Sequence, residues 1–268
     1  MRMRSSNPVL SEGHFSHLAR DLEQEQGGGA VQPATMTIAG TVNKAAMALV
    51  LCVITAVWVW FQYDPTNPGA TMPWMWGGLI VGFILGLATA FIPRIAPFTT
   101  LPYAAAQGLA LGGISAFVES QLVQQIGPEG QGIAIQAMAC TLGVFAVMLT
   151  LYMTRIIRVG QKLRAGITAA VGGIMVFYLI AIVGSLFGWT GASQFLSFNN
   201  GGLLSIGISV VIVGIAAFSL LLDFDSIERG AAMGAPKVME WYGAFGLMVT
   251  LVWLYLEILR LLSKLKSR

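Results

Sequence analysis

Three acidic side chains lie in or beside long apolar stretches of this sequence. Glu257 lies well inside the last apolar run, and Asp223 and Asp225 close the apolar run that precedes it. An ionisable group at membrane depth is costly, so a functional role is the default hypothesis for it. These three carboxylates are therefore the first candidates for chemistry.

Carboxylates from two neighbouring helices would form a pH-sensitive pair. In a medium of low dielectric constant two such groups cannot both stay ionised cheaply. They share a proton, and they separate or bind a cation when the proton leaves. Carboxylate oxygens also suit calcium, although two or three carboxylates supply only part of the roughly six to eight oxygens that this ion prefers.

Structural explanations stand beside this hypothesis. Glu257 and Arg260 are three residues apart and could neutralise each other on a helix. Asp223 and Asp225 could mark a helix end at the cytoplasmic surface. A sixth helix ending at 225 and a seventh starting at 240 would also hold Glu257 roughly 25 Å from the aspartates. A pair then requires that the sixth helix continue past Asp225, or that the seventh be displaced or broken.

The residues that intramembrane enzymes use are missing from the apolar runs. Both histidines, His14 and His17, lie in the polar N-terminal segment, so neither a serine–histidine pair nor a histidine metal cluster is expected at membrane depth. Cys52 and Cys140 lie inside apolar runs, where a thiol acts as a small hydrophobe. We predict no catalytic residues, no certain metal site and no cofactor.

The composition predicts the elements that must position the carboxylates. The chain is 56% hydrophobic and 10% charged, whereas a soluble domain carries roughly 25% charged residues. Lipid-embedded backbone must satisfy its own hydrogen bonds, and the apolar segments are too long for barrel strands, so an all-α polytopic membrane protein is predicted. Seven segments are long enough to span: 43–62, 74–93, 101–122, 131–154, 165–187, 202–224 and 240–262.

Basic residues predict the orientation of these spans. The predicted loops 63–73, 119–130 and 188–201 contain no Lys or Arg, whereas the alternate loops and the N-terminal segment do. Residues 1–42 are therefore expected to form a polar cytoplasmic tail, and 43–268 the membrane domain. Because the basic residues flank apolar runs and form no single patch, no nucleic-acid partner is predicted.

The C-terminal tail fits this rule poorly. With seven spans, Lys264, Lys266 and Arg268 would end outside. Either this tail tolerates the far side, or the last segment enters the membrane without crossing it.

Small residues at helical spacing predict close helix packing. The motifs are Gly78-x-x-x-Gly82-x-x-x-Gly86 in the second span and Gly108-x-x-x-Gly112 in the third. Such spacing allows backbones to approach each other in membranes, so both helices are expected to form packing seams.

Two stretches carry a family resemblance. The Leu-Asp-Phe-Asp-Ser-Ile stretch that closes the sixth span and the Trp-Leu-Tyr-Leu-Glu-Ile-Leu-Arg-Leu-Leu stretch of the seventh resemble the Bax-inhibitor-motif membrane proteins, the YccA- and YetJ-like group. The resemblance covers about residues 43–266. Glu257 stands where relatives usually carry Asp, and the connection between the sixth and seventh spans is longer than in relatives.

The resemblance implies a bundle around a central seventh helix. It also implies that a carboxylate pair between the sixth and seventh helices acts as the pH sensor of a calcium leak. Glu257 matches the seventh-helix acid, and its partner is either Asp223 or Asp225. Arg94 matches a basic residue that helps to hold the latch in relatives. Apart from the resemblance, Glu119 lies near the outer end of the third span, where it could attract cations at an entrance or simply belong to a solvated helix end. The family subgroup points to a bacterial plasma membrane.

Two functions follow as hypotheses. The first is a pH-sensitive calcium leak channel or transporter, with the lipid bilayer and calcium as partners. The alternative is a non-transporting modulator of a membrane protease or another stress-response protein, which the long polar N-terminal segment favours. An enzymatic role is not expected.

Overall fold

The computed structural model describes residues 35–64, 67–188, 198 and 202–268. The predicted tail therefore lies mostly outside the described residues, and with it the feature that favoured a protease modulator. Within Met36–Arg268, which forms one compact unit, seven helices are long and apolar enough to cross a membrane. The predicted all-α membrane architecture is confirmed.

The spanning helices follow the predicted apolar runs. They are α2 (Ile38–Gln62), α3 (Met72–Phe91), α4 (Ala96–Ile126), α5 (Ile133–Met153), α6 (Gln161–Leu186), α8 (Leu203–Ala232) and α9 (Met239–Lys266). Short 3-10 turns, η2 (Pro68–Ala70), η3 (Pro93–Ile95) and η4 (Gly127–Gly130), precede α3 and flank α4.

The largest difference from the sequence prediction is the end of α8. The helix continues to Ala232, past both aspartates, whereas the sequence predicted an end near 224. Ion pairs of Asp225 with Arg229, one turn later, and with Arg164 of α6 support this extension. Loss of apolarity therefore does not mark the end of this helix.

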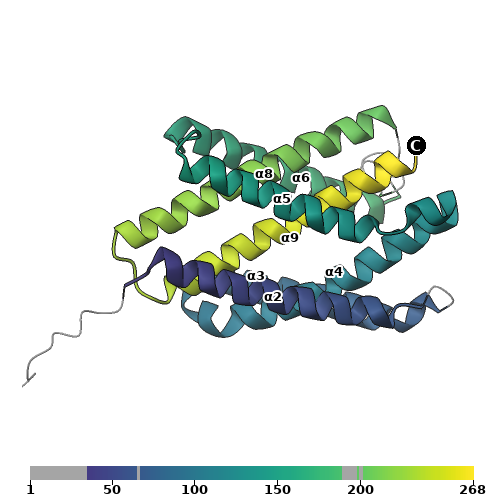
Figure 1. The fold of residues 1–268 in the computed structure, drawn as a ribbon, viewed down its shortest axis with the longest axis horizontal. Coiled ribbons are helices and arrows are strands. Elements are labelled where there is room, and N and C mark those ends of the chain that lie inside the picture. The colour runs from purple at the N-terminus through teal and green to yellow at the C-terminus, as the bar shows by residue number, and fades with distance from the viewer. Residues whose placement is uncertain (1–34, 65–66, 189–197, 199–201) are drawn as a thin grey trace, which may run out of the picture. The chain divides into compact units, whose positions relative to one another are not determined.

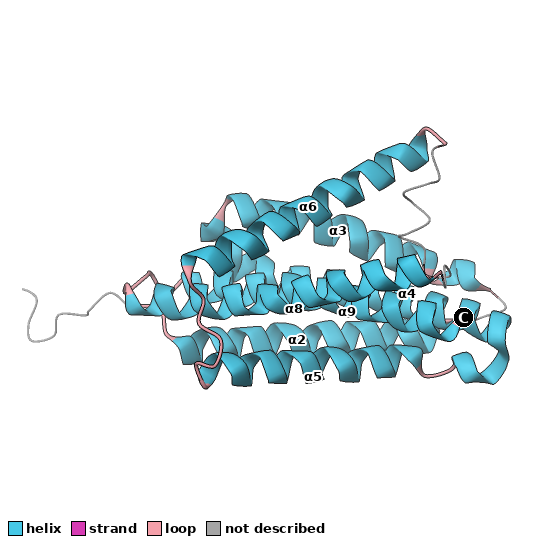
Figure 2. Cartoon of the chain, turned by 90° about the horizontal axis from the view of Figure 1, so that it is seen from above, coloured by secondary structure: helices cyan, strands magenta, loops and turns pink. Residues whose placement is uncertain are grey.

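The seventh helix, α9, is central. It contacts α2, α4, α5 and α8, and it contributes more residues to the buried core than any of the other described helices. Figure 1 shows α9 running between α5 and α8 on one side and α2, α3 and α4 on the other. In contrast, α6 packs mainly against α8, and Figure 2 shows it diverging from the bundle towards its C-terminal end.

The glycine motifs form the predicted seams around α4. A methyl group at Gly112 would lie 2.3 Å from the carbonyl oxygen of Ala56 on α2, and one at Gly108 would lie 2.2 Å from that of Cys52. On the other side of α4, a methyl group at Gly78 of α3 would lie 2.5 Å from the carbonyl oxygen of Ala106. Both backbones therefore approach α4 too closely for a side chain, as the spacing predicted.

The last helix crosses the whole bundle. At its start, Glu240 contacts Thr37, which caps the N-terminus of α2. At its end, the Lys266 ammonium donates to the backbone carbonyl of Glu129 in η4, 3.0 Å away. The C-terminal tail therefore lies at the opposite end of the bundle from the start of α2. The side of the membrane on which this tail lies stays a prediction.

Candidate ion pathway between α8 and α9

Two side-chain contacts indicate the antiparallel register of α8 and α9. The carboxylate of Asp223 lies beside the side chain of Thr250, and Lys264 donates to the hydroxyl of Ser209 over 2.9 Å. Ser209 and Asp223 are as far apart along α8 as Thr250 and Lys264 are along α9. Both contacts therefore belong to one register.

This register creates a repeating seam. Ala216 lies midway between Ser209 and Asp223, and Glu257 lies midway between Thr250 and Lys264, so Glu257 lies level with Ala216. A spacing of seven residues is close to two helical turns, which keeps each set of three on one face of its helix. We call this set the α8/α9 seam: Ser209, Ala216, Asp223, Thr250, Glu257 and Lys264.

Glu257 is enclosed at the middle of the seam. Its side chain is 1% exposed, and both carboxylate oxygens accept hydrogen bonds of 2.8 Å from Nη1 of Arg260. The phenol of Tyr178 on α6 donates to the same carboxylate. The guanidinium of Arg260 also lies 5.2 Å from the ring centre of Phe198. A buried charge needs such partners, because an unpaired one would cost several kcal/mol.

Asp223 and Lys264 occupy the two outer levels of the seam. One carboxylate oxygen of Asp223, Oδ2, is shielded from solvent and has no hydrogen-bond partner among the residues that the structure describes. Lys264 is fully buried, although it stands only two residues from the end of α9. The seam thus places an acid, an acid and a base at successive levels, with Asp223 and Glu257 about 10 Å apart along the helix axis.

The expected carboxylate pair is not formed in this structure. Asp225 pairs with Arg164 of α6 and with Arg229 of its own helix, α8, so it does not belong to the seam. Asp223 lies two helical turns from the level of Glu257. The alternative in which Glu257 and Arg260 neutralise each other is the observed arrangement, with Tyr178 as an additional donor.

The two other predicted residues lie away from the seam. Arg94 is exposed in η3, and no contact among the described residues joins it to a carboxylate of the seam or to Asp225. Glu119, near the end of α4, accepts a 3.4 Å hydrogen bond from the backbone N–H of Ala134 in the first turn of α5. It thereby satisfies a helix N-terminus whose N–H groups lack intrahelical acceptors.

Sequence reasoning missed a buried ion pair outside the seam. Glu240 is 1% exposed and pairs with Lys44 of α2. It also accepts hydrogen bonds from the N–H and the hydroxyl of Thr37, at 3.0 and 2.9 Å. Gly40 leaves room for this carboxylate, because a methyl group there would lie 2.3 Å from Oε1. A lone Lys in the first span and a lone Glu at the start of the last one were the available signal.

The seam and the central helix can be compared with known families. The sequence profile described as Bax inhibitor 1 like matches residues 7–267, nearly the whole chain. The chain belongs to the Bax inhibitor 1 like family. No curated protein and no solved structure matches it.

Membership confirms the resemblance of the sixth and seventh spans to the Bax-inhibitor-motif proteins, and the YccA- and YetJ-like subgroup stays a prediction. In this Bax inhibitor 1 like protein those spans are α8 and α9, the two helices that form the seam. The family is channel-like or transporter-like and is no known class of enzyme. The roles that the resemblance assigned to individual residues remain predictions.

Proposed function

We propose that this protein is a pH-sensitive leak pathway for calcium, and that cations pass along the α8/α9 seam. The observation that carries the proposal is the burial of the Glu257 carboxylate at the middle level of this seam. A carboxylate with no functional role is expensive at that depth. Asp223, two turns away, supplies a second hard-oxygen ligand of the kind that calcium prefers.

In this proposal the described state is the closed one. Arg260 and Tyr178 occupy the carboxylate of Glu257, so it has no free oxygen for a cation. The ammonium of Lys264 lies at the next level and repels cations from that end. Opening therefore requires that Glu257 exchange Arg260 for another partner, which is a proton or a metal ion.

In this mechanism the latch is the ion pair of Glu257 and Arg260, and not a proton shared between two carboxylates. Protonation of Glu257 removes the charge that holds Arg260, and the ion pair then loses most of its stabilisation. The pH dependence follows from one buried carboxyl group and its arginine. Asp223 attracts cations to the seam and does not take part in the latch.

The test is calcium flux into proteoliposomes over a pH series. Glu257→Gln mimics the protonated carboxyl, so we expect a flux that no longer varies with pH and equals the acid limit of the parent. Asp223→Asn is expected to lower the flux at every pH and to keep its pH dependence. Glu228→Gln is the matched control, because Glu228 is a partly exposed acid on α8 that pairs with Arg155.

Two results would reject the proposal. One is a parent protein that carries no calcium above empty liposomes at any pH. The other is a Glu257→Gln variant whose pH profile equals that of the parent and of Glu228→Gln.

A further inference from the structure

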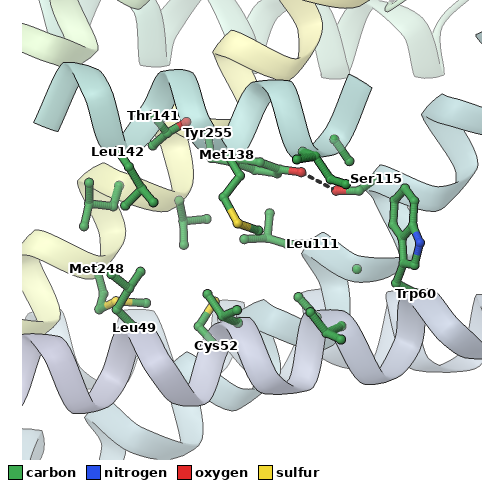
Figure 3. A pocket seen from close by; sticks show the side chains of 18 of the residues that line it. Leu49, Cys52, Trp60, Leu111, Ser115, Met138, Thr141, Leu142, Met248 and Tyr255 are labelled. Carbon is green, nitrogen blue, oxygen red and sulfur yellow. Dashed lines mark hydrogen bonds between the residues drawn. The ribbon is translucent and has the colours of Figure 1, made fainter. Parts of the chain in front are cut away.

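A groove lies on the side of α9 that faces away from the seam. Its volume is about 330 Å³, within the range of small-ligand sites. Figure 3 shows α2 and α5 as its two walls, with Leu49 and Cys52 on one and Met138 and Leu142 on the other. Residues of α4 and α9 form its floor, among them Leu111, Met248 and Tyr255.

The lining of the groove suits hydrocarbon. Its hydroxyl groups are already satisfied: those of Ser115 and Tyr255 bond each other at 2.6 Å, and that of Thr141 donates to the carbonyl of Ala137 at 2.8 Å. The lining residues include no Asp, Glu, Lys or Arg. A polar ligand would therefore lose its hydration without gaining partners.

The mouth of the groove opens towards the bilayer. Val57 and Phe61 on α2, and Ile135 and Leu142 on α5, line the groove and are also among the exposed apolar residues of these spanning helices. Lipid is the solvent of such a surface, so an empty apolar hollow there is filled from the membrane. A spanning helix, roughly 10 Å or more in diameter, is too wide for a hollow of this volume.

We propose that the groove binds one acyl chain of a membrane phospholipid. A free fatty acid is a poorer fit, because no basic side chain in the lining could pair with its carboxylate. A phospholipid keeps its headgroup in the interfacial layer and inserts only its chain. Trp60 lies among the lining residues towards the end of α2, where an amphipathic ring suits the headgroup level. The binding does not depend on the conduction of ions by the seam.

Photolabelling of the full-length protein in liposomes tests this site. The probe is a phosphatidylcholine with a diazirine in one acyl chain, and labelled positions are mapped by peptide mass spectrometry. We expect label on Met248 and Leu251 of α9, which are 1% and 8% exposed and which a chain reaches only from inside the groove. Ile80 and Phe83 of α3 face outwards and report ordinary lipid contact.

Filling the groove supplies the matched variants. Val53→Trp at the wall and Leu142→Trp at the mouth should each reduce labelling of α9 several-fold, and either one suffices if the other fails to fold. Ile80→Trp adds the same side chain to the outer face of α3 and should leave α9 labelling unchanged.

Three outcomes would overturn the proposal. The first is label on α3 with none on Met248 and Leu251. The second is α9 label that neither filling variant reduces. The third is α9 label from a diazirine fatty acid but none from the phosphatidylcholine, which would assign the groove to free fatty acids.

Discussion

The hydroxyl of Ser115 on α4 and the phenol of Tyr255 on α9 lie 2.6 Å apart in the interior of the bundle. Tyr255 is two residues from Glu257, about 200° around the helix, so α9 presents a hydrogen bond on one face and an ion pair on the other. Because Tyr178 of α6 donates to Glu257 of that ion pair, polar contacts join the central helix to α4 on one side and to α6 on the other.

The Ser115–Tyr255 bond should be measurable as a coupling. We expect Ser115→Ala and Tyr255→Phe to lower the free energy of unfolding by about 1 kcal/mol each, and the double variant to lose less than the sum. Chemical unfolding in mixed micelles measures this. Ser219→Ala is the control partner for Tyr255→Phe, because among the described residues Ser219 bonds within α8, to Ile215, so those two changes should be additive.

The ion pair of Lys44 and Glu240 predicts a different pattern. Lys44→Met leaves a buried carboxylate without its cation, so we expect a loss of about 3 kcal/mol in the free energy of unfolding. The double variant Lys44→Met/Glu240→Met removes both charges and should recover much of this loss.

An exposed ion pair is the control for the loss expected from Lys44→Met. Arg155 and Glu228 are 70% and 38% exposed, so Arg155→Met should cost less than about 1 kcal/mol in the same unfolding assay. Equal losses for Lys44→Met and Arg155→Met would show that the pair at the start of α9 is not enclosed.

Close packing of α2 on α4 predicts a strong effect at Gly112. A side chain there meets the backbone of Ala56, which cannot rotate away. Gly112→Leu should therefore lower the free energy of unfolding by about 1–3 kcal/mol or more. Thermal unfolding in detergent measures the loss. Gly143→Leu on α5 is the control, because no atom lies within 4 Å of its added methyl position. A Gly112→Leu variant as stable as Gly143→Leu would contradict the packing.

The crossing of α9 predicts opposite sides for Lys237 and Lys266. In a Cys52→Ala/Cys140→Ala background, a membrane-impermeant maleimide applied to sealed vesicles should modify only one of Lys237→Cys and Lys266→Cys. The other should react after the membrane is opened. Modification of both from one side of sealed vesicles would mean that α9 does not span.

The architecture was predictable because apolar length alone specifies spanning helices. The small-residue motifs also identified which faces pack closely, although they did not say that Gly112 meets Ala56. The sequence placed the end of α8 too early, because charge pairs such as Asp225 with Arg164 become visible only when α6 and α8 are side by side.

The candidate site was predictable only in part. The depth of Glu257 and its spacing from Arg260 could be seen in one segment of sequence. Tyr178 is far away along the chain and reaches the carboxylate only through tertiary packing. The seven-residue repeat of Ser209, Ala216 and Asp223 acquires meaning only once the register against α9 is known.

The length of α9 makes membrane thickness a variable for this protein. Its 28 residues extend for about 42 Å, whereas the hydrocarbon core of a typical bilayer is about 30 Å thick. Where the apolar part of a helix exceeds the hydrocarbon core the helix tilts, and it tilts more in a thinner membrane. Glu240 bonds Thr37 at one end of α9, and Lys266 bonds Glu129 at the other. A change of tilt would therefore strain these two contacts before it affected the middle of the helix.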